Sequence, residues 1–428
     1  MKEGYKKTEL GWIPREWRVI GTEEILIDEK NSIKIGPFGS QLKKEYLTNS
    51  GYKVYGQENV FRNDFNLGDR YIDQERYDLL KSSSLKPGDL VISMMGTVGK
   101  TAIIPNDIKK GIMDSHLIRL RVDEKVYNKK LLQQIIQNST LVKNQIKKLS
   151  VGGIMEGLSS TIIKQLKFPL PLLKEQQKIE NILSSVDSQI EDADKIIEKT
   201  KELKKGLMQR LLTKGIGHKE FKKSEVGEIP KSWDVKELID ISLGKGEYGI
   251  GAAATEYENG RPRYLRITDI GDSCDLLMED IKGVNDEKFS DYLLKENDIV
   301  FARTGNTTGK SYVYNKNDGV LVYAGFLIKF SIDPLKCNVK FLKYIVQSKR
   351  YWDWVKVMST RSGQPGINSA EYSKFKIQLP SVSEQNKIEE ILSSIDSQIE
   401  EYENKRVKLE EVKKGLMQQL LTGKLRVI

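Results

Sequence analysis

The chain has 428 residues, of which 30% are charged and 38% hydrophobic, a composition typical of a globular protein with more than one domain. It contains no apolar run of about 18 residues and no apolar signal-peptide segment, which excludes a membrane span and favours a cytoplasmic location. Two cysteines and two histidines are too few for a cysteine-based or histidine-clustered metal site, and 70 Lys and Arg against 60 Asp and Glu mildly favour a polyanionic partner.

The first variable region, residues 1–173, predicts mixed α/β structure. The runs "DLVISMM" (89–95) and "DSHLIRLRV" (114–122) are rich in the residues of buried strands, and "NKKLLQQIIQ" (128–137) has the period of a helix. A long helix is expected over 174–214, because apolar residues recur there along one face.

The second half repeats the first. "YKKTELGWIPREWRV" from Tyr5 returns as "FKKSEVGEIPKSWDV" from Phe221, and "KIENILSSVDSQIE" from Lys178 returns as "KIEEILSSIDSQIE" from Lys387. A second variable region is therefore expected over 215–382 and a second long helix over 383–428. Strands are predicted in "NDIVFAR" (297–303) and "AGFLIKFSI" (324–332) and a helix in "VKFLKYIVQS" (339–348).

The two long helices are expected to pair. Their apolar residues are Ile179, Ile182, Leu183, Val186, Ile190, Ala193, Ile197, Leu203, Leu207 and Leu211 in the first, and Ile388, Ile391, Leu392, Ile395, Ile399, Tyr402, Leu409, Val412, Leu416 and Leu420 in the second. A stripe of this length is naturally buried in a coiled coil. Ser381 and Glu384 fit a capping box. Gly206 and Gly415 interrupt the stripe, either to allow close helix approach or as frayed helix ends.

Two glycine-rich stretches resemble phosphate-binding loops. They are "SMMGTVGKT" (93–101) and "ARTGNTTGKS" (302–311), named below the Gly-Lys loops. A nucleotide cradle needs a glycine five residues before the Gly-Lys pair, but those positions hold Met94 and Thr304. The spacing therefore favours a glycine-supported turn after a strand, and no nucleotide or other cofactor is expected.

The chain resembles the specificity subunit of type I restriction–modification systems. The resemblance lies in "IGPFGSQLKKEYL" from Ile35, "VYGQENV" from Val54, "GDLVISMMGTVGKTAII" from Gly88, "FPLPLLKEQQKI" from Phe168 and "LPSVSEQNKIEEILSSID" from Leu379, in the family's order. The second half departs from it, with "GEYGIGAAATEY" from Gly246 in place of a "GPFGS" sequence, so we expect the two loops to make different contacts.

The resemblance implies a non-catalytic, DNA-reading subunit. Residues 1–173 and 215–382 would be two target recognition domains, and 174–214 and 383–428 conserved helical spacers that set the distance between half-sites. Partners would be double-stranded DNA, methyltransferase subunits that modify adenine at N6, and restriction subunits. The sequence holds no Asp/Asn-Pro-Pro-aromatic motif for adenine methylation, which agrees with chemistry on partner subunits.

An antiparallel tandem repeat brings its domains near a two-fold relation, and two different domains predict a bipartite, asymmetric target. Base contacts need Arg, Lys, Asn or Gln on loops, with Lys and Ser/Thr at phosphates. The candidate DNA-binding residues are Ser40, Gln41, Lys43, Lys44, Gln57, Asn59, Thr97 and Lys100 in the first half, and Arg261, Arg263, Arg266, Arg303, Thr304, Asn306, Thr307, Lys310 and Arg361 in the second.

Each of these residues could equally be a solvated surface or turn residue. Two alternatives for the whole chain also stay open: an ATP-binding enzyme that uses the Gly-Lys loops, and a structural coiled-coil scaffold.

Overall fold

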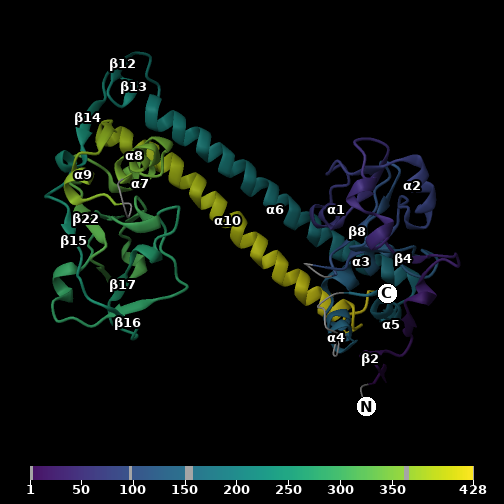
Figure 1. The fold of residues 1–428 in the computed structure, drawn as a ribbon. Helices are drawn as coiled ribbons and strands as arrows, with labels where there is room; N and C mark the ends of the chain where they lie inside the picture. Colours follow the sequence, from purple (N-terminus) through teal and green to yellow (C-terminus); the bar gives the residue numbers. More distant parts are fainter. Residues whose placement is uncertain (1–2, 96–98, 150–157, 361–365, 428) are drawn as a thin grey trace. The chain divides into compact units, whose positions relative to one another are not determined.

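The computed structural model describes residues 3–95, 99–149, 158–360 and 366–427, and these form two compact units. Unit 1 consists of Met1–Ala193 with Lys405–Ile428, and unit 2 of Asp194–Asn404. Both units contain helix and sheet, in the same order along the chain (Figure 1). The tandem repeat predicted from the sequence is therefore a repeat of a mixed α/β fold, with a long helix in each copy.

Unit 1 is centred on a four-stranded antiparallel sheet. Its strand order is β4 (Ile33–Ile35), β10 (Leu117–Leu120), β7 (Leu90–Ser93) and β8 (Thr101–Ile103). Every residue of β7 and β10 is buried, and Leu117 pairs with Ser93 in the register. The strands predicted within 89–95 and 114–122 are confirmed, with shorter bounds.

Smaller sheets and short helices complete unit 1. The sheets are β6 (Tyr71–Ile72), β5 (Tyr52–Tyr55) and β9 (Gly111–Met113), with β5 and β9 parallel; β11 (Lys167–Leu170) with β3 (Arg18–Gly21); and β1 (Tyr5–Thr8) with β2 (Gly11–Pro14). The helices are α1 (Gln57–Arg62), α2 (Gln74–Leu79), α3 (Lys129–Asn138), α4 (Thr140–Leu149) and α5 (Ser160–Gln165).

Helix α3 shows how local sequence forms an element. Asn128 caps it, because its side chain accepts a hydrogen bond from the backbone N–H of Leu131. Leu131, Leu132, Ile135 and Ile136 recur at helical spacing and are buried. The helix predicted over 128–137 is confirmed.

Unit 2 has corresponding sheets, one of them with four strands where unit 1 has three. The central sheet has the order β15 (Glu247–Tyr248), β22 (Leu327–Ser331), β19 (Asp298–Ala302) and β20 (Ser311–Val313). The others are β16 (Ala254–Glu256), β18 (Lys282–Val284), β17 (Arg263–Leu265) and β21 (Leu321–Tyr323); β14 (Asp234–Glu237) with β23 (Lys376–Leu379); and β12 (Phe221–Ser224) with β13 (Gly227–Pro230). Its short helices are α7 (Val339–Ile345), α8 (Lys349–Ser359) and α9 (Ser369–Ser373). The predicted strands within 297–303 and 324–332 and the helix within 339–348 are confirmed.

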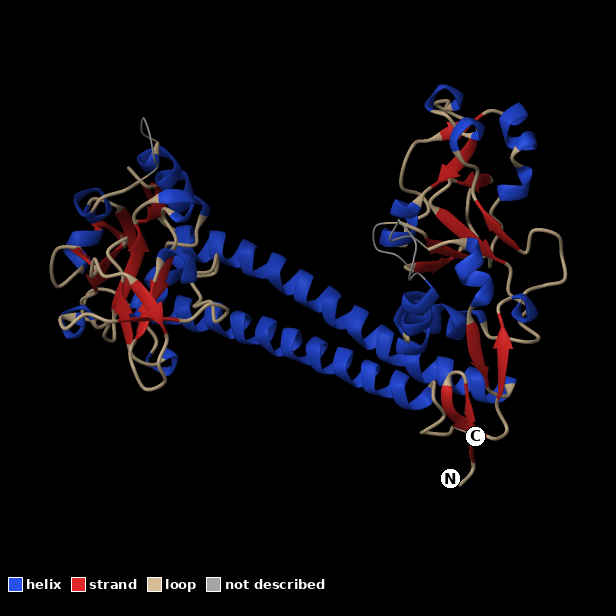
Figure 2. Cartoon of the chain, turned by 60° about the horizontal axis from the view of Figure 1, so that its bottom comes forward, coloured by secondary structure: helices blue, strands red, loops and turns tan. Residues whose placement is uncertain are grey.

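The two long helices, α6 (Leu173–Lys214) and α10 (Val382–Leu420), contribute to both units. In unit 1, Ile179 and Leu183 of α6 share a hydrophobic core with Met417 and Leu420 of α10. Within this unit Lys413 also forms an ion pair of 2.6 Å with Asp187. The helices therefore run antiparallel in this unit, and Figure 2 shows them side by side.

Unit 2 contains the complementary parts of the same helices. Leu211 of α6 and Ile388 and Leu392 of α10 belong to its core. Lys204 forms an ion pair of 2.5 Å with Asp396, and Lys201 one of 2.6 Å with Glu403. Helix pairing predicted from the apolar stripe is thus found within each unit.

Parts of the apolar stripe remain in solvent. Leu203, Ile391 and Val412 were expected to be buried but are 55%, 39% and 51% exposed. Two paired helices cover only a narrow seam of each other, so a wider stripe keeps an exposed edge. Close approach at Gly206 and Gly415 is also wrong, because a Cβ at either position would meet nothing within 4 Å.

The predicted capping box at α10 forms only in part. The Ser381 hydroxyl accepts from the backbone N–H of Glu384 at 3.4 Å. The Glu384 carboxylate instead accepts from Trp233 Nε1 at 3.0 Å and contacts His218 Nε2 at 2.8 Å. In a capping box this carboxylate would accept a hydrogen bond from the backbone N–H of Ser381. Here it instead contacts Trp233 and His218, which are distant in the chain.

Unit 1 has the counterpart of this cluster. Glu175 accepts from Trp17 Nε1 at 2.9 Å and from Arg426 Nε at 2.7 Å. The Tyr5 hydroxyl donates to the carbonyl of Gly423 at 2.8 Å, so the segment after α10 packs on the first strands of the chain. Each unit therefore joins a tryptophan near its first hairpin to a glutamate near the start of a long helix.

Among the helices that the structure describes, none combines the length and the apolar character that crossing a membrane requires.

Candidate nucleic-acid interface

The Gly-Lys loops each connect two paired antiparallel strands. The first joins β7 to β8 and the second β19 to β20. In the first, Ser93 N donates to Lys100 O at 2.8 Å; in the second, Ala302 N donates to Lys310 O at 2.8 Å. Gly99 and Gly309 have φ of 81° and 92°, a conformation that favours glycine. The predicted glycine-supported turn is confirmed at these positions.

This geometry differs from a nucleotide cradle. In a phosphate-binding loop the Gly-Lys pair opens a helix, whose N-terminal N–H groups hold the phosphates. Here the strands β8 and β20 follow Lys100 and Lys310. The described residues of the two loops therefore do not form the strand–loop–helix arrangement on which the ATP-binding alternative depends.

Three separate segments of unit 1 meet at the turn formed by Asp114, Ser115 and His116, named here the first hub. Gly36 N donates to Leu117 O at 3.1 Å, Asp114 N to Tyr55 O at 2.8 Å, and Met94 N to His116 O at 2.9 Å. The first hub thus joins the "GPFGS" and "VYGQENV" segments to the start of the Gly-Lys loop.

The equivalent turn of unit 2, Ala324, Gly325 and Phe326, is named the second hub. Gly249 N donates to Leu327 O at 3.2 Å, Ala324 N to Leu265 O at 2.9 Å, and Arg303 N to Phe326 O at 3.0 Å. These bonds match those of the first hub one by one.

Gly249 therefore occupies the place of Gly36, although the sequences around them differ. A Cβ at Gly36 would lie 1.9 Å from the carbonyl oxygen of Asp114, and one at Gly249 would lie 2.3 Å from that of Ala324. Both positions require glycine because the backbone of the hub passes so close. The next two residues are Pro37 and Phe38 in unit 1 but Ile250 and Gly251 in unit 2, so the side chains offered at this place differ.

Most candidate residues of unit 1 lie on exposed turns. Ser40 and Gln41 belong to the 3-10 helix η2 (Gly39–Gln41). Lys43 precedes the next turn, η3 (Lys44–Tyr46), and Lys44 is its first residue; all four are exposed, as is Lys100.

The other three candidates of unit 1 differ from this pattern. Gln57 is half-buried, and Thr97 lies outside the described residues. Asn59 is buried, and its amide accepts from Gly56 N at 2.9 Å and donates to the carbonyls of Asp64 and Leu67. These bonds occupy the Asn59 side chain, which does not favour a contact with DNA.

The arginines of unit 2 are largely engaged in internal contacts. Arg263 is 5% exposed and donates to Met278 Sδ and to the carbonyl of Leu277. Lys53 has the same strand position in unit 1, is also buried, and donates to the carbonyl of Asn66. In both units a basic side chain at this strand position donates a hydrogen bond to a backbone carbonyl of a loop.

Arg266 and Arg261 are paired with acids. Arg266 forms a two-point contact with Asp269, through Nε at 3.1 Å and Nη2 at 2.7 Å, and also contacts Asp280. Hydrogen bonding to Asp269 raises the pKa of Arg266. Arg261 is exposed and lies 3.6 Å from Glu258.

The remaining candidates of unit 2 surround the second Gly-Lys loop. Arg303 lies over the ring of Tyr248 at 5.0 Å, and Lys310 Nζ is 2.7 Å from Asp272. Asn306 is exposed, while Thr304 and Thr307 are half-buried. Arg361 lies outside the described residues.

Buried carboxylates stand at the base of both hairpins. Asp89 accepts from Lys86 N at 2.9 Å and from Arg121 Nε at 3.2 Å, and Asp298 accepts from Lys295 N at 2.8 Å and from the Ser331 hydroxyl. Burial raises the pKa of both carboxyl groups, against the opposing effect of these hydrogen bonds. These contacts hold the strands that carry the Gly-Lys loops.

Other residues at the first hub were not predicted from the sequence. Asp114 of the first hub is buried, whereas Arg70, His116 and Phe38 around it are exposed or half-exposed. Asp114 and His116 could have been predicted from the segment "MDSHLIRL", because it combines polar turn residues with one of the two histidines of the sequence. Arg70 lies in no motif and is brought to Asp114 only by folding.

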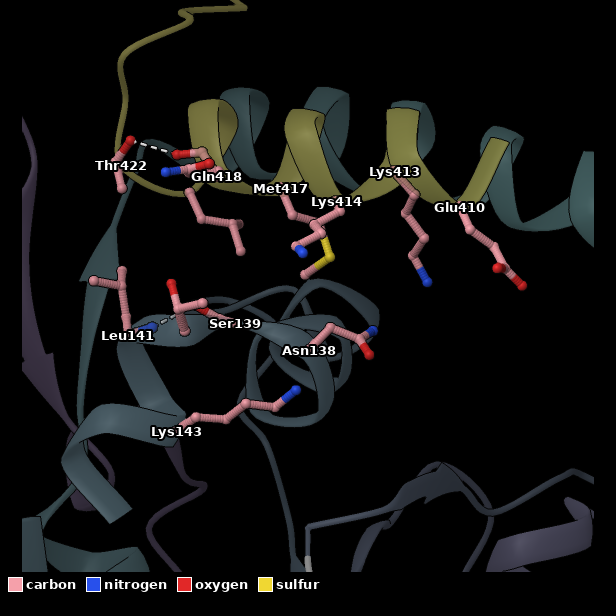
Figure 3. Close-up of a pocket in the computed structure, with 12 residues that line it drawn as sticks. Asn138, Ser139, Leu141, Lys143, Glu410, Lys413, Lys414, Met417, Gln418 and Thr422 are labelled. Carbon is pink, nitrogen blue, oxygen red and sulfur yellow. Dashed lines mark hydrogen bonds between the residues drawn. The ribbon is translucent and has the colours of Figure 1, made fainter. Parts of the chain in front are cut away.

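A separate cavity of about 510 Å³ opens in unit 1 where the α3–α4 junction faces the end of α10 (Figure 3). Leu141 and Met417 contribute apolar surface, and Lys143, Lys413 and Lys414 contribute charge. Of the candidate DNA-binding residues that the structure describes, none lines it.

Two related domains, each presenting polar loops around one hub on a packed scaffold, define a protein with two recognition modules. The family model for the type I restriction modification DNA specificity domain matches residues 33–202 and again 230–411. The chain belongs to this family.

Curated relatives agree with this assignment. The chain is similar to the type I restriction enzyme MjaVIII specificity subunit of Methanocaldococcus jannaschii, with 32% identity over 74% of this chain and 75% of the relative. It is 21% identical to the StySPI specificity subunit of Salmonella potsdam over 81% of this chain and 76% of that one.

Solved structures share the fold. The S subunit of a type I system from M. genitalium matches with a TM-score of 0.55 and 14% identity, over 95% of this chain and 96% of its own. A chain from a study of assembly and conformational transition in the type I system matches with a TM-score of 0.54 and 15% identity, over 96% of this chain and 99% of its own.

Proposed function

We propose that this chain is the DNA-specificity subunit of a type I restriction–modification complex and that each unit recognises one part of a bipartite, asymmetric DNA site. The observation that carries the proposal is the pair of hubs, which share backbone hydrogen bonds but differ in their exposed side chains. Such a pair supports one mode of docking with two base preferences.

In this proposal residues 1–173 and 215–382 are the target recognition domains, and 174–214 and 383–428 are the helical spacers. The exposed candidates Ser40, Gln41, Lys43, Lys44, Lys100 and Asn306 are the proposed DNA contacts, together with Arg303 beside the second hub. Lysines on the turns would bind phosphates and fix the docking of each domain.

The long helices are proposed to set the spacing between half-sites. Helices of 42 and 39 residues would each extend roughly 60 Å, which exceeds one DNA turn of about 34–36 Å. Deleting one heptad from each helix, Glu180–Val186 and Glu389–Ile395, keeps the stripe in phase and shortens each helix by about 10 Å. The modified motif should then lose spacer base pairs, or methylation should fail. Full activity on an unchanged motif would exclude the ruler role.

The chemistry is proposed to reside on partners. Methyltransferase subunits that modify adenine at N6, and through them restriction subunits, would dock on this non-catalytic chain, which needs no cofactor. Leu203, Ile391 and Val412 on the long helices are exposed and leave apolar surface that such partners could contact.

The test is methylation-site sequencing of cells that express this chain with its methyltransferase subunits. We expect a single asymmetric motif with two specified parts and an unspecified spacer. A protein that bound ATP through Lys100, or a scaffold without effect on methylation, would produce no such motif.

A further inference from the structure

The first hub contains a buried carboxylate that holds an exposed guanidinium. The Asp114 side chain is 8% exposed, and its Oδ2 accepts from Arg70 Nη2 at 3.0 Å. The Arg70 side chain is 45% exposed, so it is anchored at one end while it reaches solvent. The pair joins residues 44 positions apart, on the loop before β6 and on the turn after β9.

The surrounding backbone fixes the position of Asp114. Its N–H donates to Tyr55 O at 2.8 Å, and its Oδ1 accepts from the backbone N–H of His116 at 3.0 Å. A Cβ at Gly56 would lie 2.4 Å from Arg70 Nη2 and 2.7 Å from Asp114 Oδ2, so glycine at this position leaves the space that the pair occupies. The guanidinium is therefore oriented before any ligand binds.

A guanidinium has five N–H donors in a rigid fork, and the contact with Asp114 uses one of them. In the major groove, guanine offers O6 and N7 as a pair of acceptors that matches this fork. An arginine fixed in advance by a second residue loses less conformational freedom on binding. The side chains of His116 and Phe38 beside the hub are also 44% and 57% exposed, so the pair lies on an accessible surface.

We propose that Arg70, positioned by Asp114, recognises a guanine in the half-site bound by unit 1. The inference rests on the proposed DNA-recognition function and assigns one base preference to one residue. Unit 2 has Ala324 at the place of Asp114, and the fork of Arg266 is occupied by Asp269. The guanine contact therefore belongs to the first half-site alone.

The experiment measures DNA binding by the complex of the full chain with its methyltransferase subunits. The probe is a duplex with the motif found by methylation-site sequencing, and a set of duplexes each substituted at one base pair. For Arg70→Ala we expect about tenfold to hundredfold weaker binding to the motif, with discrimination lost at one G·C pair of the first half-site and kept at all others.

Arg70→Lys keeps the charge beside Asp114 but lacks the rigid fork, so it should fold normally and weaken the same base preference. Asp114→Asn should weaken the preference at that same base pair and at no other, because it acts through Arg70. Arg62→Ala is the matched control: Arg62 is an exposed arginine of unit 1, paired with Glu58 on α1, and its loss should change no base preference.

The outcomes separate the two levels of the proposal. If the unsubstituted complex does not distinguish its motif from unrelated DNA, the proposed function itself fails. If it does, and both Arg70 variants keep every base preference, only the role of Arg70 is wrong. A uniform loss at all positions would make Arg70 a phosphate contact, and a change in the half-site that depends on residues 215–382 would assign it to the other unit; either result overturns the inference.

Discussion

The two hubs have equivalent backbone hydrogen bonds but expose different side chains. In the first, buried Asp114 holds Arg70 beside a half-exposed His116; in the second, Ala324 and Gly325 precede a phenylalanine, Phe326, that is 58% exposed. The hydrogen bonds that join each hub to its neighbouring strands are nevertheless equivalent. The hydrogen-bonded framework is therefore the same in both units while the exposed side chains differ, as the proposed recognition of two different DNA sequences requires.

The buried residues around the two hubs make similar hydrogen bonds in both units. Lys53 and Arg263 both donate from a strand to backbone carbonyls. Asn59 and Asp269 both accept from a backbone N–H three residues earlier, at Gly56 and Arg266. A positive charge near a hub is therefore no sign of DNA contact unless it is exposed.

The largest effect is expected from replacing residues 215–382 by the second variable region of another family member. Because the hubs lie in separate domains, one part of the methylated motif should change completely and the other should stay the same. Methylation-site sequencing measures both at once. A change in both parts would show that the two hubs do not act independently.

The equivalence of Gly36 and Gly249 can be tested by adding one methyl group to each. Gly36→Ala and Gly249→Ala place a Cβ against hub carbonyls, and each should lower the free energy of unfolding of its domain by about 1–3 kcal/mol or more. Gly206→Ala, where a Cβ meets nothing within 4 Å, is the control and should stabilise α6 by about 1 kcal/mol. The measurement is urea denaturation of the full chain. Equal behaviour of all three variants would contradict the close approach at the hubs.

The exposed residue of the second hub, Phe326, is apolar, so we expect it to contribute less to base recognition than Arg70 does in the first half-site. Phe326→Ala should reduce binding to the motif by about 1 kcal/mol, roughly fivefold, with the loss confined to one position of the second half-site, because an aromatic ring contacts a thymine methyl group or a base step. Leu335→Ala, at an 87% exposed leucine of the same unit, should leave binding unchanged. Loss of preference in the first half-site would contradict the assignment.

The smallest effect is expected at the two loop lysines, and it should differ between the units. Lys100 is exposed, whereas Lys310 is paired with Asp272. Lys100→Ala should lower the dependence of log binding constant on log salt by about one unit without changing base preference, and Lys310→Ala should lower it by less. Lys231→Ala, at a lysine paired with Glu220, serves as the control. Two unchanged slopes would leave the Gly-Lys loops as structural turns only.

Much of the fold could be predicted because it depends on local patterns. Strands β7, β10, β19 and β22 follow from their apolar, β-branched runs, and α3, α6 and α10 from helical periodicity. The turn at each Gly-Lys loop follows from its spacing, since glycines there permit positive φ whatever the rest of the chain does. Lys43 and Lys44 of "IGPFGSQLKKEYL" are exposed, and their contact with DNA stays a prediction.

The site itself was decided by tertiary structure. Gly36, Tyr55 and Met94 are far apart in the chain and meet at the first hub only because β10 pairs with both β4 and β7 while the turn before it bonds to β5. Strand pairing also buried Arg263 and brought Arg70 to Asp114, which no local pattern encodes. By itself the sequence determined the repeat, its elements and its family resemblance. Which of its charged residues reach solvent depended on hydrogen bonds between distant strands.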